Sequence, residues 1–248
     1  MRGASNIAKF MGCRTRIVPM KLLVLDTSTE YCSAALWLDG QIHARRLLAE
    51  QRHSSLLLPM VDELLRETSM TLRQLDGIAY GAGPGSFTGL RIACAVTQGL
   101  ALGADLPVVG VSTLESIAGQ TGADRVLTVL DARMAEVYWA AYQREPAGWR
   151  CAIEPALALP ESVRVPDGDD WVGAGNGFAA LGAVLRPRLT AQLVRIDDTI
   201  MPDAAAMAPL AVQAFERGES VDAALAAPIY LRDKVAQTID ERRARKTA

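Results

Sequence analysis

The sequence predicts an α/β protein built from two related halves. Short apolar runs that are typical of buried strands alternate with longer segments whose apolar residues recur at helical spacing. The run LLVLD, which ends at Asp26, returns as VLTVLD, which ends at Asp131, 105 residues later. Each run leads through a short turn into a second strand. This repeat predicts that both halves open with the same strand meander, with a chance match of two apolar strands as the alternative.

Three strands open the first half. Residues 21–26 and 32–38 are apolar runs, and residues 41–48 have the character of a third strand. Asp39-Gly40, between the second and third strands, is typical of a type I′ hairpin. We therefore expect a three-stranded antiparallel meander.

Helices and further strands follow. We expect a helix that begins at Ser54 or Ser55, ends near Thr68 and has one apolar face. A longer helix of small residues runs to about Gly103. The pattern SxxE at Ser112 is a capping box for another helix. Four further segments have strand character: 77–80, 107–111, 126–131 and 136–142.

The last third of the chain is less regular. Residues 147–170 are rich in proline, glycine and charge, and we expect them to be the loosest region. Residues 171–177 predict a strand that runs into a glycine turn. Pro202-Asp203 caps a helix that reaches about Arg217, and Gly218 stops it.

Four parts of the chain are expected. Residues 20–115 form the first subdomain, and residues 116–232 form the second, whose last helix could pack back on the first. Residues 1–19 lack the apolar core of a signal peptide. We expect them to be disordered, or to lie upstream of a natural start at Met20. The charged tail, 233–248, is expected to be disordered.

The composition argues against several functions. Half of the 248 residues are hydrophobic and 22% are charged, with a net charge of −2, which suits a sizeable core. The body of the chain lacks the basic surplus of a dedicated nucleic-acid binder. No run of about 18 apolar residues is present, so no transmembrane helix is expected. The four cysteines form no CxxC pair. The chain has only two histidines, His43 and His53, and because they are ten residues apart they exclude HExxH and HxxxH metal sites.

Two segments could contact a ligand. In Asp26-Thr27-Ser28-Thr29, a carboxylate at a strand end is followed by small hydroxyls. Such a turn can hold a hydrated Mg²⁺ and contact phosphate through backbone N–H groups, although a turn whose side chains satisfy its own backbone is the alternative. The glycine loop GAGPGSFTGLR, residues 81–91, lacks the GK[ST] of a P-loop. It could meet a ligand, meet a partner or serve as a structural turn. The candidates for nucleotide or phosphate contact are Asp26, Thr27, Ser28, Gly83, Gly85 and Ser86.

Five stretches of the chain resemble the TsaB family, also called YeaZ. They are LLVLDTSTEYCSAAL, HSSLLLPMVDELL, GIAYGAGPGSFTGLRIACAVTQGLALGADLPVVGVSTLES, VLTVLDARMAEVYWAAYQ and PIYLR, which together span about Met20 to Arg232. The GAGPGSFTGLR signature is highly specific. The resemblance implies an α/β fold of the ASKHA (actin-like, Hsp70-like ATPase) type with two related βββαβα-type subdomains. This agrees with the duplicated meander.

The resemblance also implies a function. TsaB-type proteins take part in making N6-threonylcarbamoyladenosine beside the anticodon of tRNAs that read ANN codons. They bind and activate the transferase TsaD and are not catalytic themselves. The implied partners are TsaD, the ATPase TsaE and, in isolation, a second copy of the chain, with tRNA met only through the complex. We expect a cytoplasmic protein with no membrane contact and no intrinsic cofactor, whose partners bind ATP or ADP and metal.

The residues agree with a non-catalytic role. TsaD-type proteins carry a metal-binding HxxxH motif in the helix after the strand that corresponds to PVVGV. Here the two ligand positions fall on Thr113 and Ile117, and neither can replace imidazole at iron or zinc. We therefore predict no metal and no catalytic residue. An ASKHA-type small-molecule kinase or ATPase is the alternative.

The partner surface is expected on two helices with apolar or small-residue faces. These are the helix near residues 54–68 and the helix after the glycine loop. Small residues allow close approach between helices, although a helix buried within the domain has the same composition. The candidate interface residues are Leu57, Met60, Val61, Leu64, Phe87, Arg91, Ala95 and Gly99.

Overall fold

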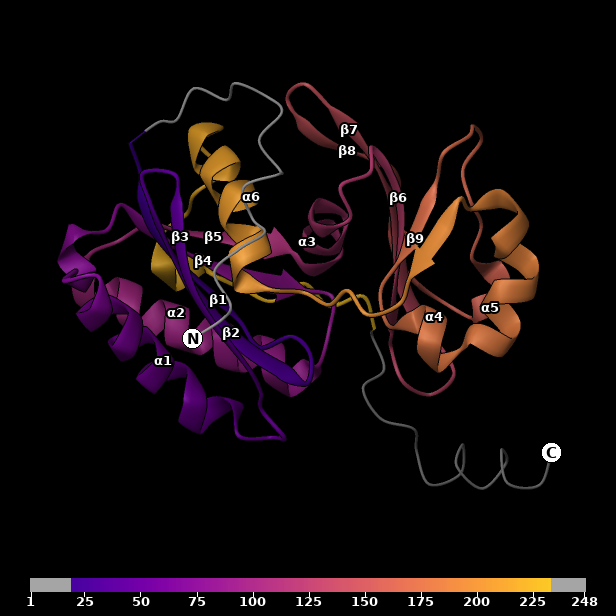
Figure 1. The fold of residues 1–248 in the computed structure, drawn as a ribbon. Helices are drawn as coiled ribbons and strands as arrows, with labels where there is room; N and C mark the ends of the chain where they lie inside the picture. Colours follow the sequence, from indigo (N-terminus) through magenta and orange to yellow (C-terminus); the bar gives the residue numbers. More distant parts are fainter. Residues whose placement is uncertain (1–18, 233–248) are drawn as a thin grey trace, which may run out of the picture.

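The computed structural model describes residues 19–232. The charged tail expected over residues 233–248 lies outside the described residues, as does all of the expected leader except residue 19. Within the described part, the chain forms two lobes, each built on a five-stranded mixed sheet (Figure 1).

The first sheet has the strand order β3-β2-β1-β4-β5. Strands β1, β2 and β3 form the predicted antiparallel meander, and β4 and β5 continue it in parallel with β1. The turn between β2 and β3 has positive φ at Asp39 (52°) and Gly40 (97°), as a type I′ hairpin requires. The strands are β1 Lys21–Asp26, β2 Tyr31–Leu38, β3 Gln41–Leu48, β4 Gly77–Gly83 and β5 Val108–Ser112.

Helices cover both faces of the first sheet. Leu23 and Leu25 of β1 pack on one face with α1 (His53–Glu67) and α2 (Phe87–Ala104). Leu22 and Val24 point to the other face, where α6 (Ala204–Glu216) packs (Figure 1). Because successive residues of a strand alternate between faces, a strand covered on both sides is apolar throughout. The last α-helix of the described residues thus completes the core of the first lobe.

The second sheet repeats the topology of the first. Its order is β10-β9-β6-β7-β8, so β6, β7 and β8 correspond to β1, β2 and β3. β6 pairs antiparallel with β7 and parallel with β9, just as β1 pairs with β2 and β4. The duplicated meander is confirmed. The strands are β6 Arg125–Asp131, β7 Val137–Glu145, β8 Gly148–Ala158, β9 Val172–Ala174 and β10 Arg195–Asp197.

The remaining helices connect and cover the lobes. α3 (Thr113–Gln120) lies between the two sheets and contacts β5, β6 and α6. The subdomain boundary expected between residues 115 and 116 falls inside it. The second lobe also carries α4 (Gly177–Ala180) and α5 (Gly182–Leu189). Single 3₁₀ turns occur at Leu72–Gln74, Pro160–Ser162, Thr190–Gln192 and Ala223–Leu225.

Several local expectations were wrong. Residues 147–170 are not loose throughout, because β8 occupies Gly148–Ala158 and pairs with β7 along its length. β8 is an edge strand, half-buried at most positions, so its sequence has no clear apolar run. α1 begins at His53, and Arg52 caps it without a side-chain bond. The Ser55 hydroxyl instead donates to the Arg52 carbonyl.

Among residues 19–232, one helix has the length and composition of a membrane span. α2 has 18 residues and a mean hydropathy of 1.2. The core helix of a folded domain meets the same criteria. In this chain the inner side of α2 packs against β4, and its buried residues include Leu90, Ala93 and Thr97.

Candidate functional site

The glycine loop packs directly against the turn that follows β1. The Ser86 amide donates to the Ser28 carbonyl at 2.7 Å, and the Thr27 hydroxyl donates to the Gly89 carbonyl at 2.6 Å. A Cβ atom on Gly85 would lie 2.5 Å from the Ser28 carbonyl oxygen, and one on Gly89 would lie 1.9 Å from that of Thr27. These two glycines are therefore needed because two backbone segments of the same chain touch.

Other parts of the chain hold the far side of this loop. The Ile229 amide donates to the Ala82 carbonyl at 2.7 Å. Gly83 has φ of 126°, and a Cβ there would lie 2.6 Å from the Ile229 carbonyl oxygen. The buried Thr113 hydroxyl donates to the Pro84 carbonyl at 2.5 Å. Contacts within the chain thus hold this loop on both sides.

Asp26 is sealed inside the first lobe. Its side chain has no exposed surface, and one carboxylate oxygen, Oδ2, lacks a hydrogen-bond partner. Burial raises the pKa of Asp26 to about 7, against the lowering effect of hydrogen bonds from Ser28. The nearby Asp203 carboxylate adds to the rise in the pKa, and Arg46 opposes it. A carboxylate without access to solvent cannot hold a ligand in a neighbouring cleft.

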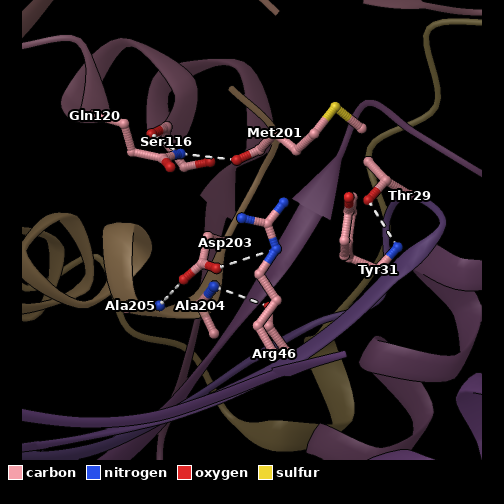
Figure 2. A network of polar contacts seen from close by, with 10 residues as sticks. Thr29, Tyr31, Arg46, Ser116, Gln120, Met201, Asp203, Ala204 and Ala205 are labelled. Carbon is pink, nitrogen blue, oxygen red and sulfur yellow. Dashed lines mark hydrogen bonds and ion pairs between the residues drawn. The ribbon is translucent and has the colours of Figure 1, made fainter. Parts of the chain in front are cut away.

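Figure 2 shows the polar network where the chain returns from the second lobe to α6. This network contains Asp203 and Arg46, the two charged residues that act on the pKa of Asp26. Asp203 caps α6 by accepting from the Ala205 amide at 2.7 Å, and it pairs with Arg46 at 3.5 Å. The Arg46 guanidinium also lies 4.0 Å from the centre of the Tyr31 ring. Asp203 and Arg46, the charged residues near Asp26, are thus engaged in contacts that join β2, β3 and α6. Their role here is structural.

A cleft of about 590 Å³ lies between the lobes. Of the predicted phosphate contacts, Ser28, Gly85 and Ser86 line it, whereas Asp26, Thr27 and Gly83 do not. The other sides of the cleft include His53, Asp131, Arg133, Asn176, Tyr230 and Arg232, none of which is among the predicted site residues. Asp131 ends the second repeated strand, and Tyr230 and Arg232 belong to the PIYLR motif, so part of this set stands out in the sequence.

The predicted partner face divides into two groups. Leu57, Met60, Val61 and Leu64 are at most 3% exposed and belong to the core beneath α1. Their assignment to a partner surface was wrong, because the apolar face of α1 packs on the first sheet. Arg91, Ala95 and Gly99 lie exposed on α2, and Phe87 is half-buried beside them.

Phe87, Arg91 and Tyr230 form a stack at the start of α2. The Arg91 guanidinium lies 3.7 Å from the centre of the Phe87 ring and donates to the Tyr230 hydroxyl at 2.9 Å. The two aromatic rings are 5.2 Å apart. Phe87 therefore packs within the chain while leaving part of its surface open.

The two positions that match the HxxxH ligands are part of the core. Thr113 and Ile117 have no exposed surface, and Ile117 packs in the cluster shared by α3 and β6. Among residues 19–232, no group of three or more His, Cys, Asp or Glu side chains has an arrangement suited to a metal ion.

Comparison with known proteins decides the family. The model of the family described as "TsaD: tRNA N6-adenosine threonylcarbamoyltransferase" matches residues 47–239. The TsaB protein of Escherichia coli (strain K12), named as a tRNA threonylcarbamoyladenosine biosynthesis protein, is 42% identical over 88% of this chain and 96% of its own. The TsaB protein of Haemophilus influenzae is 37% identical over 87% of this chain and 95% of its own. The chain belongs to the TsaB family.

A solved structure agrees with this assignment. The structure titled "YeaZ from Pseudomonas aeruginosa" superposes with a TM-score of 0.78 at 42% identity, covering 86% of this chain and 100% of that one. This TsaB-family chain has the α/β ASKHA-type fold that the resemblance implied, with two lobes of the same strand order.

Thr113 offers a test of how this TsaB-family chain holds its glycine loop. Thr113→Val keeps the shape but removes the bond to the Pro84 carbonyl, which stays buried. We expect a loss of about 1 to 3 kcal/mol in the free energy of unfolding, measured in urea. Thr97→Val is the matched control, because the buried Thr97 hydroxyl has no hydrogen-bond partner, and its loss should be neutral or stabilising. Equal effects at the two sites would contradict the role of Thr113.

Proposed function

We propose that this chain is a non-catalytic subunit in tRNA threonylcarbamoyladenosine biosynthesis and that it binds and activates TsaD. The product would be N6-threonylcarbamoyladenosine beside the anticodon of tRNAs that read ANN codons. TsaE joins the complex, tRNA is met only through it, and the chain forms a homodimer in isolation. The chain acts in the cytoplasm and holds no cofactor, because its partner subunits bind the ATP or ADP and the metal.

One observation carries the non-catalytic role. The two positions that match the metal ligands of TsaD are Thr113 and Ile117, both fully buried and packed within the chain. The Thr113 hydroxyl donates a hydrogen bond to the Pro84 carbonyl. The carboxylate of Asp26 is likewise closed to the cleft. These residues support a scaffold that has kept the fold of an enzyme and uses the catalytic positions for packing.

The outer face of α2 supports the role of a binding partner. Arg91, Ala95 and Gly99 are exposed and recur every four residues, so they lie on one side of the helix. A Cβ atom on Gly99 would have no neighbour within 4 Å, and Leu102 on the next turn is 62% exposed. Small residues on a helix let the backbone of a partner helix come close. We assign this face, without the buried α1 residues, to the partner interface.

Gly99→Trp tests the interface. The indole would project from the outer face of α2 without disturbing the fold, since the site is open. We expect the affinity for TsaD to fall at least 100-fold, because a bulky ring keeps the two helices apart. Ala95→Trp should have the same effect. The measurement is isothermal titration calorimetry of purified TsaD with each variant.

Ala183→Trp is the matched control. Ala183 is an exposed small residue on α5, in the second lobe and away from α2. Its replacement should leave the affinity for TsaD unchanged, and all three variants should keep the unfolding midpoint of the original chain. An interface on α2 is excluded if Gly99→Trp and Ala95→Trp bind TsaD as tightly as the control does.

The alternative is an ASKHA-type kinase or ATPase. The cleft of about 590 Å³ between the lobes favours it, because Ser86 and Arg133 offer a hydroxyl and a cationic group there. ATP turnover by the purified chain distinguishes the two functions. We expect none above background without TsaD and TsaE, and robust hydrolysis by the chain alone would contradict the scaffold.

A further inference from the structure

A short segment near the end of the described chain crosses from one lobe to the other. We call residues 226–232 the strap. Its first part is held on the first lobe, where the Gln98 side chain donates to the Ala226 carbonyl at 3.1 Å. The Ala227 amide donates to the Tyr80 hydroxyl at 2.9 Å. Together with the bond from the Ile229 amide to Ala82, these contacts fix the strap along α2 and the glycine loop.

The middle of the strap lies beside the outer face of α2. Tyr230 accepts a hydrogen bond from Arg91 and packs against the ring of Phe87. Its side chain is partly open, with 42% of the residue exposed. A molecule that occupies the face around Arg91 would therefore touch the strap, or alter the stack that holds it.

The end of the strap binds the second lobe through Arg232. The Arg232 guanidinium pairs with the Glu136 carboxylate at 2.6 Å and donates to the Ala132 carbonyl at 2.9 Å. The two charged side chains are only 16% and 28% exposed, so water screens the pair less than it screens an ion pair on the open surface. Arg232 thus contacts residues on both sides of the loop between β6 and β7.

That loop has an unusual backbone. Arg133, Met134 and Ala135 are three consecutive non-glycine residues with φ of 62°, 57° and 60°. Each such residue costs about 1 kcal/mol or more, and the conformation persists only when neighbouring contacts enforce it. Arg133 and Met134 also line the cleft. Arg232 contacts Ala132 and Glu136, the first and last residues of this loop, and so can hold the loop in its left-handed conformation from both ends.

We propose that the strap couples the outer face of α2 to the shape of this cleft loop, with Arg232 as the positioning residue. Only Leu231 separates Tyr230 from Arg232, and two extended residues span at most about 7 Å, which leaves little slack. A change at the Arg91–Tyr230 contact therefore reaches Arg232 and the loop. The coupling is a property of the single chain and does not depend on which partner occupies α2.

Hydrogen exchange of single amides, measured by NMR on the full chain, tests the coupling. The Ala132 amide donates to the Glu136 carbonyl at 3.0 Å, and the Glu136 amide donates to the Arg133 carbonyl at 3.1 Å, so both report on the loop. We expect Arg232→Ala to accelerate exchange at both amides at least 10-fold. Arg91→Ala and Tyr230→Phe, which remove the Arg91–Tyr230 hydrogen bond in the middle of the strap, should accelerate it about 3-fold or more.

Two controls make the result specific. Arg73→Ala removes an exposed arginine of the first lobe outside the strap and should leave the loop amides unchanged. The amides of Leu127 and Val129 in β6 must keep their protection in every variant, which separates local loosening from global unfolding. Arg232→Lys, which keeps the charge, should give intermediate exchange.

Each outcome decides a part of the proposal. If Arg232→Ala leaves exchange at Ala132 and Glu136 as it is, Arg232 does not position the loop and the proposal fails. If Arg232→Ala accelerates exchange but Arg91→Ala and Tyr230→Phe do not, the loop is held locally and the coupling to α2 is overturned.

Discussion

Gly89→Ala is expected to lower the free energy of unfolding by about 3 kcal/mol or more. The new Cβ would lie 1.9 Å from the Thr27 carbonyl oxygen and 3.0 Å from its carbon. Both atoms belong to the backbone, so no side chain can turn aside to make room. The helix must move away from the turn after β1, which also breaks the bond from the Thr27 hydroxyl to the Gly89 carbonyl. Urea unfolding followed by circular dichroism measures the loss.

Gly99→Ala is the matched control on the same helix. A Cβ there meets nothing within 4 Å, and alanine has a better helix propensity than glycine. We expect a gain of about 0.5 to 1 kcal/mol. The opposite signs at Gly89 and Gly99 would establish that backbone contact, and not helix propensity, requires the glycine in the loop. A loss at Gly89 no larger than 1 kcal/mol would refute the close packing.

Asp26→Asn should stabilise the protein at neutral and alkaline pH. The pKa of Asp26 is about 7 in the folded chain because of burial, against an ordinary value of 3.8. Between about pH 4 and pH 7 the folded state therefore keeps a proton that the unfolded state has lost, so the free energy of unfolding of the original protein falls as the pH rises through this range. Asparagine carries no charge at any pH. The advantage of the variant should grow by about 3 to 4 kcal/mol between pH 4 and pH 8.

The pH dependence of this difference is the quantity to measure, by urea unfolding of both proteins at several pH values. Other titrating groups, such as Glu115, whose pKa is also raised by burial, contribute equally to both proteins and cancel. Asp39→Asn is the control, since Asp39 is exposed in a hairpin turn with φ of 52° that asparagine tolerates. A difference that is constant across the pH range would show that burial does not raise the pKa of Asp26 in the folded chain.

Much of the fold followed from the sequence because neighbouring residues determine it. The predicted caps at Ser112 and Asp203 are in place: Ser112 accepts from the Glu115 amide and Asp203 from the Ala205 amide. Each cap bonds an amide two or three residues away, so the local sequence is sufficient to predict it. The repeated strands that end in Asp26 and Asp131 predicted the duplicated topology for the same reason.

The site was harder to predict, because the same pattern serves different ends. The apolar stripe of α1, with Leu57 and Leu64, suits a partner surface and a core helix equally well. Only the position of the first sheet decides that these residues are buried. The exposed face of α2 shows the converse, since the surroundings of Ala95 and Gly99 depend on what the rest of the chain leaves uncovered.

The sequence by itself determined most elements of the first lobe, the caps at Ser112 and Asp203, the repeat and the absence of imidazole ligands at Thr113 and Ile117. The tertiary structure decided what the glycine loop is for. Its glycines contact the turn after β1 and the strap. The hydrogen bond between Thr27 and Gly89 joins residues 62 positions apart, and the one between Ala82 and Ile229 joins residues even further apart in the sequence. Contacts at such separations depend on how the whole chain packs. A glycine that makes room for backbone therefore has the same sequence signature as one that makes room for a ligand.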